Sequence, residues 1–285
     1  MLSEAEAKAC CANLYQSDMT KLIMGDTLHP GGLSFTNKLG RLMGIESGDS
    51  VAVLASARGE SAQALGRVFK CNVLGVEFGA EAVRHTHDAS SGSGRAHFVR
   101  GDAERLPLRS GVFDAAVFEC SMSLFINKAQ AVAETTRSLR PGGKFGLSDV
   151  TIEPGALPAE LEGDLGQVLC MADALTGDGY LELLEERGFS VTTRLDASTE
   201  IIKKLDEVEG KLAAFLAFQK VSGVPAGDGR LKLSPELINK VREMVTSGEL
   251  GYWLFVVEKQ GYPTLNGCRG ADCLSPSRWL VYDCN

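Results

Sequence analysis

The sequence predicts an α/β fold built on a doubly wound, mainly parallel sheet of seven strands, with a helical insertion before the last strand. Three observations predict it. Short apolar runs alternate with segments in which apolar residues recur at helical spacing, as in βαβ units. Turn-forming residues such as Pro141-Gly142-Gly143 separate these segments. A length of 285 residues with 44% hydrophobic residues is sufficient for one large α/β domain or two small ones.

The elements follow one another in a regular order along the chain. Helices are expected over 61–70, around 80–90 and over 131–140, where the apolar spacing is helical. The strands are expected at seven apolar runs, namely 50–56, 72–78, 96–102, 112–120, 144–150, 189–195 and 252–259.

These elements divide the chain into three parts. Residues 1–32 form an N-terminal segment, with a short amphipathic helix and then the turn His29-Pro30-Gly31-Gly32. Residues 33–259 form the main domain, and 260–285 form a tail that contains Cys268, Cys273 and Cys284. Within the domain, 199–249 is mostly helical and is expected to be a lid over the ligand-binding edge; a pair of partner-binding helices is the alternative.

Charge and hydropathy exclude several classes of protein. The 29 Lys and Arg against 37 Asp and Glu give a formal net charge of −8, so we expect no nucleic-acid partner. No apolar run reaches about 18 residues, and the N-terminus lacks a signal peptide, so we expect no membrane span and a cytoplasmic protein. In that compartment the eight cysteines are expected to be reactive or core thiols and not a disulfide framework.

Acidic residues end two neighbouring strands at the edge where open parallel sheets bind ligands. Glu77 ends the second strand, 18 residues after Gly59, a distance typical of a carboxylate that binds ribose hydroxyls. A solvated acid is the alternative. Asp102 ends the third strand and can accept a hydrogen bond from an exocyclic amine such as that of adenine. Its alternative role is to cap a helix that begins at Ala103.

These residues, together with the segments GDAERLPLRSGVFDAAVFEC (101–120) and LRPGGKFGLSD (139–149), resemble the class I S-adenosylmethionine-dependent methyltransferases. The resemblance covers roughly residues 33–195, and 251–259 would be the final strand of that fold. It implies a Rossmann-like methyltransferase fold with S-adenosylmethionine as cofactor. The cofactor-binding residues that it implies are Gly31, Ala55, Gly59, Glu77, Phe78, Asp102, Ala103 and Glu119.

The turn after the first strand departs from that family. Where the family has an acidic residue followed by Gly-x-Gly, this chain has Val53, Ala57 and Gly59. The missing acid would help to place the methionine amino group, and the Cβ of Ala57 stands where the backbone approaches the ligand. This favours a reduced cofactor affinity or, as an alternative function, a non-catalytic binding protein that senses or sequesters metalloid or cofactor.

Two cysteines narrow the resemblance to the arsenite methyltransferases. Cys120 follows the fourth strand in FDAAVFECSMSLFINK, and Cys170 lies in CMADAL, upstream of Tyr180, in a segment expected to be helical. The resemblance implies that Cys120 and Cys170 are the catalytic thiolates and bind As(III), a soft ion that prefers soft ligands. The arsenic lone pair would then attack the methyl group of S-adenosylmethionine in line. A thiol reductant such as thioredoxin or glutathione is an expected partner.

Other interpretations of the cysteines remain open. LHPGGL at 28–33 resembles a bacterial branch other than the best-known arsenite enzymes. The substrate would then be a small organic molecule, with Glu119, Asp149 or His29 handling protons and the cysteines packing in the core. Cys71, at the amino end of its strand, is expected only to pack. The tail thiols, with Cys10 or Cys11, would supply a third arsenic ligand or be incidental. Thiolate ligation predicts that arsenic affinity falls at pH values below the thiol pKa.

Overall fold

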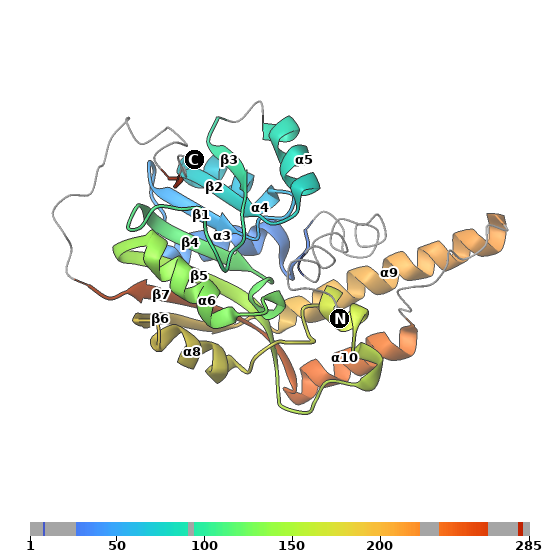
Figure 1. Ribbon diagram of the computed structural model, residues 1–285. Helices are drawn as coiled ribbons and strands as arrows, with labels where there is room; N and C mark the ends of the chain where they lie inside the picture. The colour runs from blue at the N-terminus through green and yellow to red at the C-terminus, as the bar shows by residue number, and fades with distance from the viewer. Residues whose placement is uncertain (1–7, 9–26, 91–93, 223–233, 262–278, 282–285) are drawn as a thin grey trace.

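The computed structural model describes residues 8, 27–90, 94–222, 234–261 and 279–281. Its core is a seven-stranded sheet in the order β3-β2-β1-β4-β5-β7-β6, in which β7 runs antiparallel between β5 and β6 (Figure 1). The predicted seven-stranded, mainly parallel sheet is therefore confirmed. The strands are β1 (Ser50–Leu54), β2 (Asn72–Glu77), β3 (Ala96–Arg100), β4 (Phe113–Glu119), β5 (Leu139–Ile152), β6 (Phe189–Asp196) and β7 (Leu250–Lys259).

Helices cover both faces of this sheet, which is why β1 and β2 are buried along their whole length. On one face, α3 (Gly32–Met43) and α4 (Glu60–Phe69) pack on the side chains that include Val53 and Val117. On the other face, α6 (Lys128–Ser138) and α8 (Gly177–Glu185) pack around Phe118 and Phe145. The remaining elements are α5 (Ala80–Ser90), η1 (Met122–Leu124), η2 (Ala159–Leu161) and α7 (Asp164–Val168).

The helical insertion before the last strand consists of α9 (Thr199–Ser222) and α10 (Pro235–Ser247). Ser234 caps α10 by accepting a hydrogen bond from the amide of Leu237, and Gly248 ends the helix in the left-handed region. Figure 1 shows α9 extending well beyond the sheet. Within the described residues, no helix has both the length and the hydropathy to span a bilayer.

Three local features differ from the sequence-based expectations. The helix α3 was not anticipated, because its start overlaps the Pro-Gly-Gly turn. Strand β5 begins at Leu139 instead of residue 144: Leu139 pairs with Phe113, and a register shift accommodates the predicted turn inside the strand. No helix begins at Ala103, which lies in a turn.

The end of the described chain packs on the body of the domain. The Trp279 side chain is 2% exposed and lies against Phe113, with their ring centroids 5.9 Å apart. Leu280 forms a bridge with Leu108. The tail cysteines, Cys268, Cys273 and Cys284, lie outside the described residues, as do Cys10 and Cys11.

Candidate active site

A cavity opens at the carboxyl ends of the strands that include β1, β2 and β4, the edge at which ligands bind in such sheets. Six of the eight predicted cofactor-binding residues line it, namely Ala55, Glu77, Phe78, Asp102, Ala103 and Glu119. The other two do not. Gly31 precedes α3 as its N-cap and has a φ of 80°. Gly59 precedes α4 with a φ of 79°, and a Cβ there would clash with the Phe98 ring. The roles of these two glycines are therefore conformational and steric.

Glu77 is held rigidly at the end of β2. Its Oε2 accepts a hydrogen bond from the amide of Ala57 at 2.8 Å, and its Oε1 accepts one from the amide of Gly79 at 2.7 Å. Burial raises the pKa of this carboxyl, and the backbone donors oppose the rise. Each oxygen has a further lone pair, so the carboxylate can still accept a ribose hydroxyl.

Asp102 is paired with a residue far away in the sequence. The ammonium of Lys8 lies 2.9 Å from Asp102 Oδ2 and 2.9 Å from Glu104 Oε2. The Oδ1 atom of Asp102 accepts a hydrogen bond from the amide of Glu104, which stabilises the turn and is not a helix cap. Lys8 and Glu104 both line the cavity. Sequence reasoning missed them, although Glu104 belongs to the quoted segment GDAERLPL.

The turn after β1 carries backbone strain. Ala55 has a φ of 53° and Ala57 a φ of 46°, both in the left-handed region that favours glycine. The amide of Ala57 is bound by Glu77, so this conformation is tied to the cavity wall. The glycine that Ala57 replaces is therefore not required for this turn, because Ala57 adopts the left-handed conformation itself.

Glu119, at the end of β4, belongs to a buried polar cluster. Its Oε1 accepts a hydrogen bond from Thr36 Oγ1 at 2.9 Å and lies 3.8 Å from His29 Nε2. Ser61 Oγ lies 3.3 Å from Thr36 Oγ1. Sequence reasoning did not predict that Thr36 and Ser61 join this cluster.

Several residues that line the cavity carry buried polar atoms that form no hydrogen bond with the described part of the protein. Within the described residues, Arg58 Nη2, Glu119 Oε2 and Ser121 Oγ are buried and have no hydrogen-bond partner. All three residues line the cavity. A cation, an anion and a hydroxyl in one place suit a zwitterionic nucleoside ligand such as S-adenosylmethionine. The residues present therefore fit the predicted cofactor.

A second cavity adjoins the first at Cys120 and Leu28, which line both. Its wall is mostly aliphatic. The other residues in the wall are Pro30, Met171, Lys204, Cys120 and Cys170. It is formed by residues that include Val150 of β5, Ile201 and Val208 of α9, and Leu237 and Val241 of α10. The insertion thus covers an apolar compartment next to the cofactor cavity.

The structure brings Cys120 and Cys170 together at this junction. The Cys170 thiol donates a hydrogen bond to the carbonyl oxygen of Cys120 at 3.1 Å. Both have a positive φ, 50° and 60°, and both are buried. Cys170 lies in the turn that follows α7 and not inside a helix, because α7 ends at Val168. The hydrogen bond with Cys170, together with burial, raises the pKa of the Cys120 thiol well above its usual value.

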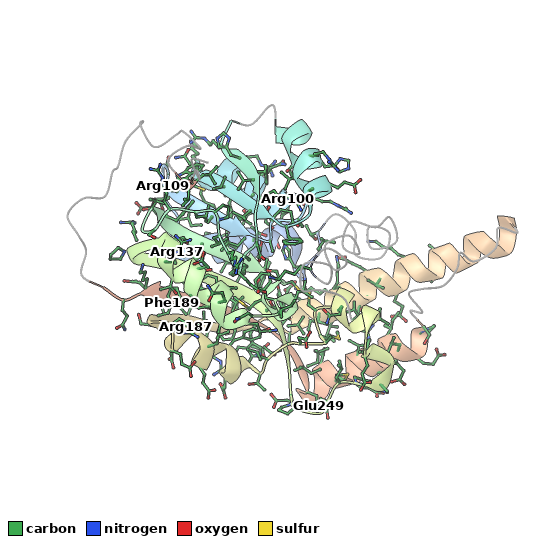
Figure 2. The ribbon with its side chains drawn as sticks, viewed as in Figure 1. Arg100, Arg109, Arg137, Arg187, Phe189 and Glu249 are labelled. Atoms are coloured by element: carbon green, nitrogen blue, oxygen red, sulfur yellow. The ribbon has the colours of Figure 1, made fainter. Side chains whose placement is uncertain are left out.

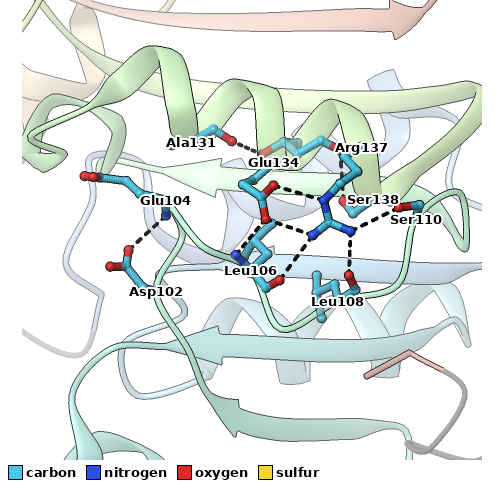
Figure 3. A network of polar contacts seen from close by, with 10 residues as sticks. Asp102, Glu104, Leu106, Leu108, Ser110, Ala131, Glu134, Arg137 and Ser138 are labelled. Carbon is cyan, nitrogen blue, oxygen red and sulfur yellow. Dashed lines mark hydrogen bonds and ion pairs between the residues drawn. The ribbon is translucent and has the colours of Figure 1, made fainter. Parts of the chain in front are cut away.

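A network on α6 holds the loop that follows Asp102 (Figure 3). Arg137, labelled also in Figure 2, forms two hydrogen bonds with Glu134, at 2.9 and 2.8 Å. Its guanidinium also donates to the carbonyl oxygens of Leu108 and Leu106, at 2.7 and 3.1 Å. Asp102 and Glu104 lie at the start of this loop and line the cavity, so the network supports one wall of the cavity from behind.

Comparison with known proteins decides the nature of the domain. Residues 53–147 match a family model described as a methyltransferase domain. The fold also matches cyclopropane synthase MmaA2 of Mycobacterium tuberculosis, with a TM-score of 0.70 over 91% of this chain and 99% of that one, at 14% identity. The chain carries a class I S-adenosylmethionine-dependent methyltransferase domain. A further neighbour of this methyltransferase is phosphoethanolamine N-methyltransferase 2 of Haemonchus contortus, solved with S-adenosyl-L-methionine (TM-score 0.73, 15% identity, 92% of this chain and 61% of that one).

Curated relatives of the methyltransferase differ in substrate. An O-methyltransferase of Pyrenophora dematioidea is 23% identical over 219 residues, 74% of this chain and 75% of the relative. An arsenite methyltransferase of Halobacterium salinarum is 28% identical over 182 residues, 58% of this chain. The matched region spans 46% of that relative, less than half its length. S-adenosylmethionine is thus the cofactor, and the substrate is a separate question.

Proposed function

We propose that this methyltransferase transfers a methyl group to As(III) held by Cys120 and Cys170. The observation that carries the proposal is the meeting of these thiols at the junction of the two cavities. Cys120 lines both the cofactor cavity and the apolar one, and Cys170 lines the apolar one. A substrate atom bound by both would be adjacent to the cofactor cavity, and the proximity lowers the barrier to reaction.

The neutral thiol suits a neutral substrate. At neutral pH the raised pKa keeps the Cys120 thiol protonated. Arsenous acid is uncharged and has three hydroxyl groups. When two thiols condense with it, two As–S bonds form, two As–O bonds break, and the two thiol protons leave in two water molecules. No net charge enters the apolar site, which avoids the cost of burying one. We therefore expect arsenic affinity to change little with pH near neutrality, in contrast to the thiolate expectation.

The cofactor would supply the methyl group, and the protein would bind the cofactor and the arsenic. S-adenosylmethionine, when bound, supplies an electrophilic methyl group. The arsenic lone pair would form the new As–C bond as the methyl–sulfur bond breaks, S-adenosylhomocysteine would leave with the electron pair of that bond, and arsenic would formally lose two electrons. Release of a trivalent product then requires two electrons from a thiol reductant, for which thioredoxin or glutathione is suited. Glu77 and Asp102 would hold the adenosine part, while α9 and α10 keep water away from the thiols.

The test measures arsenic bound to the reduced, full-length protein. We expect Cys120→Ser and Cys170→Ser each to bind one As(III) fewer per chain than wild type, and to lose methylation of arsenite supplied with glutathione. Both variants should still bind S-adenosylhomocysteine. Cys71→Ser is the matched control, because Cys71 is also buried and its thiol has a pKa raised to about 12. Equal arsenic binding by wild type and Cys120→Ser would refute the proposal.

A small organic substrate with an acidic hydroxyl is the second candidate. The aliphatic wall of the second cavity supports it, since apolar pockets with few polar groups are typical of small-molecule sites. The O-methyltransferases among the relatives also support it. In that case Cys120→Ser would retain activity on the organic substrate, and arsenic would act only as an inhibitor.

A further inference from the structure

Glu119 lies close to the position at which the first strand has Val53 instead of a carboxylate. Val53 of β1 pairs in register with Val117 of β4, so the two side chains lie on the same face of the sheet. Glu119 is two residues farther along β4 and therefore also lies on that face, closer to the carboxyl edge. Val53 and Glu119 line the same small cavity, together with Ala55 and Ser61. A carboxylate thus stands beside Val53, on the neighbouring strand.

The Glu119 carboxylate is buried, and its nearest basic side chain among the described residues is the imidazole of His29. The Glu119 side chain is 5% exposed, and within the described part of the chain no lysine or arginine pairs with it. Thr36 and His29 approach Oε1, while Oε2 is buried and has no hydrogen-bond partner among the described residues. A buried carboxylate with a free oxygen is costly unless a ligand supplies a donor or a positive charge. The site is therefore prepared for a cation.

The position of Glu119 indicates which ligand can bring a positive charge to its carboxylate. Glu119 lines the cavity that holds Glu77 and Asp102 and the small cavity beside Ala55 and Ala57. It does not line the apolar cavity under α9 and α10, where the substrate is expected. The cation should thus come from the cofactor side. The methionine part of S-adenosylmethionine carries an α-ammonium group, which a carboxylate binds through charge-assisted hydrogen bonds.

We infer that Glu119 binds the α-ammonium group of the cofactor and so replaces the acid that is Val53 in this chain. The inference rests on the cofactor assigned above and does not depend on arsenic. Thr36, which donates to Oε1, would hold the carboxylate so that Oε2 faces the ligand. The loss of the acid in β1 would therefore leave this methyltransferase competent to bind its cofactor.

The test compares two ligands of the full-length protein by calorimetric titration. S-adenosylhomocysteine carries the ammonium group, whereas 5′-methylthioadenosine has the adenosine part and lacks the amino acid. Glu119→Gln keeps the shape of the side chain. We expect it to lower the affinity for S-adenosylhomocysteine about 10- to 100-fold. Its affinity for 5′-methylthioadenosine should stay within about twofold of wild type. Because no arsenic is present, the result is independent of the substrate proposal.

A rescue variant separates charge from shape. In a Glu119→Gln background, Val53→Asp returns a carboxylate to the same cavity from the neighbouring strand, and we expect it to recover part of the lost affinity for S-adenosylhomocysteine. Unchanged affinity of Glu119→Gln for S-adenosylhomocysteine would overturn the inference, because the carboxylate would then make no contribution to binding the ammonium group. Equal weakening of both ligands would overturn it as well, because the side chain would then only support the shape of the cavity.

Discussion

Asp149 is a fully buried carboxyl whose charge acts on the Cys120 thiol, and at the scale of a single residue it links pH to stability. Its oxygens accept hydrogen bonds from the amides of Ser123 and Val150, at 3.1 and 2.8 Å. Burial nevertheless raises its pKa from 3.8 to about 6. The unfolded chain therefore loses this proton at a lower pH than the folded chain. The contribution of Asp149 to stability is present below pH 4 and is lost as the pH rises through 6.

The corresponding prediction concerns Asp149→Asn. The free energy of unfolding of wild type, relative to the variant, should fall by about 3 kcal/mol at most between pH 4 and pH 7, since Asn does not ionise. Urea unfolding of both proteins at several pH values measures this difference, in which the titration of all other groups cancels. A difference that is constant with pH would show that folding does not raise the pKa of Asp149.

Some residues of the site were predictable, and others depended on contacts between distant segments. Glu77 and Asp102 were found because strands that run in parallel end at one edge of the sheet. Lys8 meets Asp102 from 94 residues away, and Thr36 meets Glu119 across 83 residues. Such pairings leave no local pattern in the sequence. The helical expectation at Cys170 was wrong because apolar spacing continues past the end of α7 at Val168.

At the scale of elements, Arg137 connects α6 to the loop that carries Asp102 and Glu104. We predict that Arg137→Leu lowers the free energy of unfolding by about 1–3 kcal/mol, because two carbonyl oxygens and the Glu134 carboxylate lose a charged donor. Because the loop would be held less firmly, the affinity for S-adenosylhomocysteine should also fall. Urea unfolding and calorimetric titration measure the two effects.

The matched control for this element is Arg187→Leu. Arg187, labelled in Figure 2, is exposed on the surface after α8. Its removal should change the stability by less than about 0.5 kcal/mol and leave cofactor affinity unchanged. If both variants had the same effects, the Arg137 network would have no special part in holding the loop.

The same elements show what periodicity predicts well. The apolar runs predicted all seven strands, because strands covered on both faces are rich in apolar residues. The start of β5 was misplaced by five residues, since Pro141-Gly142-Gly143 is a turn signal and here lies at a bulge within the strand. Helix α3 was missed, because the left-handed Gly31 and Gly32 indicate a turn and also serve as its beginning.

At the scale of the whole molecule, segments near both ends of the described chain contact the cofactor cavity or the loop next to it. Lys8 pairs with Asp102 and Glu104 inside the cavity. Residues 279–281 bind the outer side of the loop that follows: Arg109 donates its amide hydrogen to the carbonyl oxygen of Trp279, and Val281 donates to that of Pro107. Arg137 and the C-terminal segment thus hold the 105–110 loop from two directions.

This arrangement predicts a large effect of a substitution outside the sheet. Trp279→Ala should lower the free energy of unfolding by about 3–5 kcal/mol, because it removes a buried indole from the core around Phe113. Val281→Ala, at a residue that is 52% exposed, is the control and should have little effect. Urea unfolding measures both. Equal stability of wild type and Trp279→Ala would show that the segment does not pack on the domain in solution.

The placement of β7 has a consequence for how this protein is made. It pairs with β5 from Lys144 to Ile152 and also with β6, yet it is the last of the seven strands to leave the ribosome. Until residue 259 emerges, β5 and β6 have no strand between them, and the outer edge of β5 remains open to pairing with another nascent chain. Translation that stalls before residue 250 would therefore yield a chain that requires a chaperone.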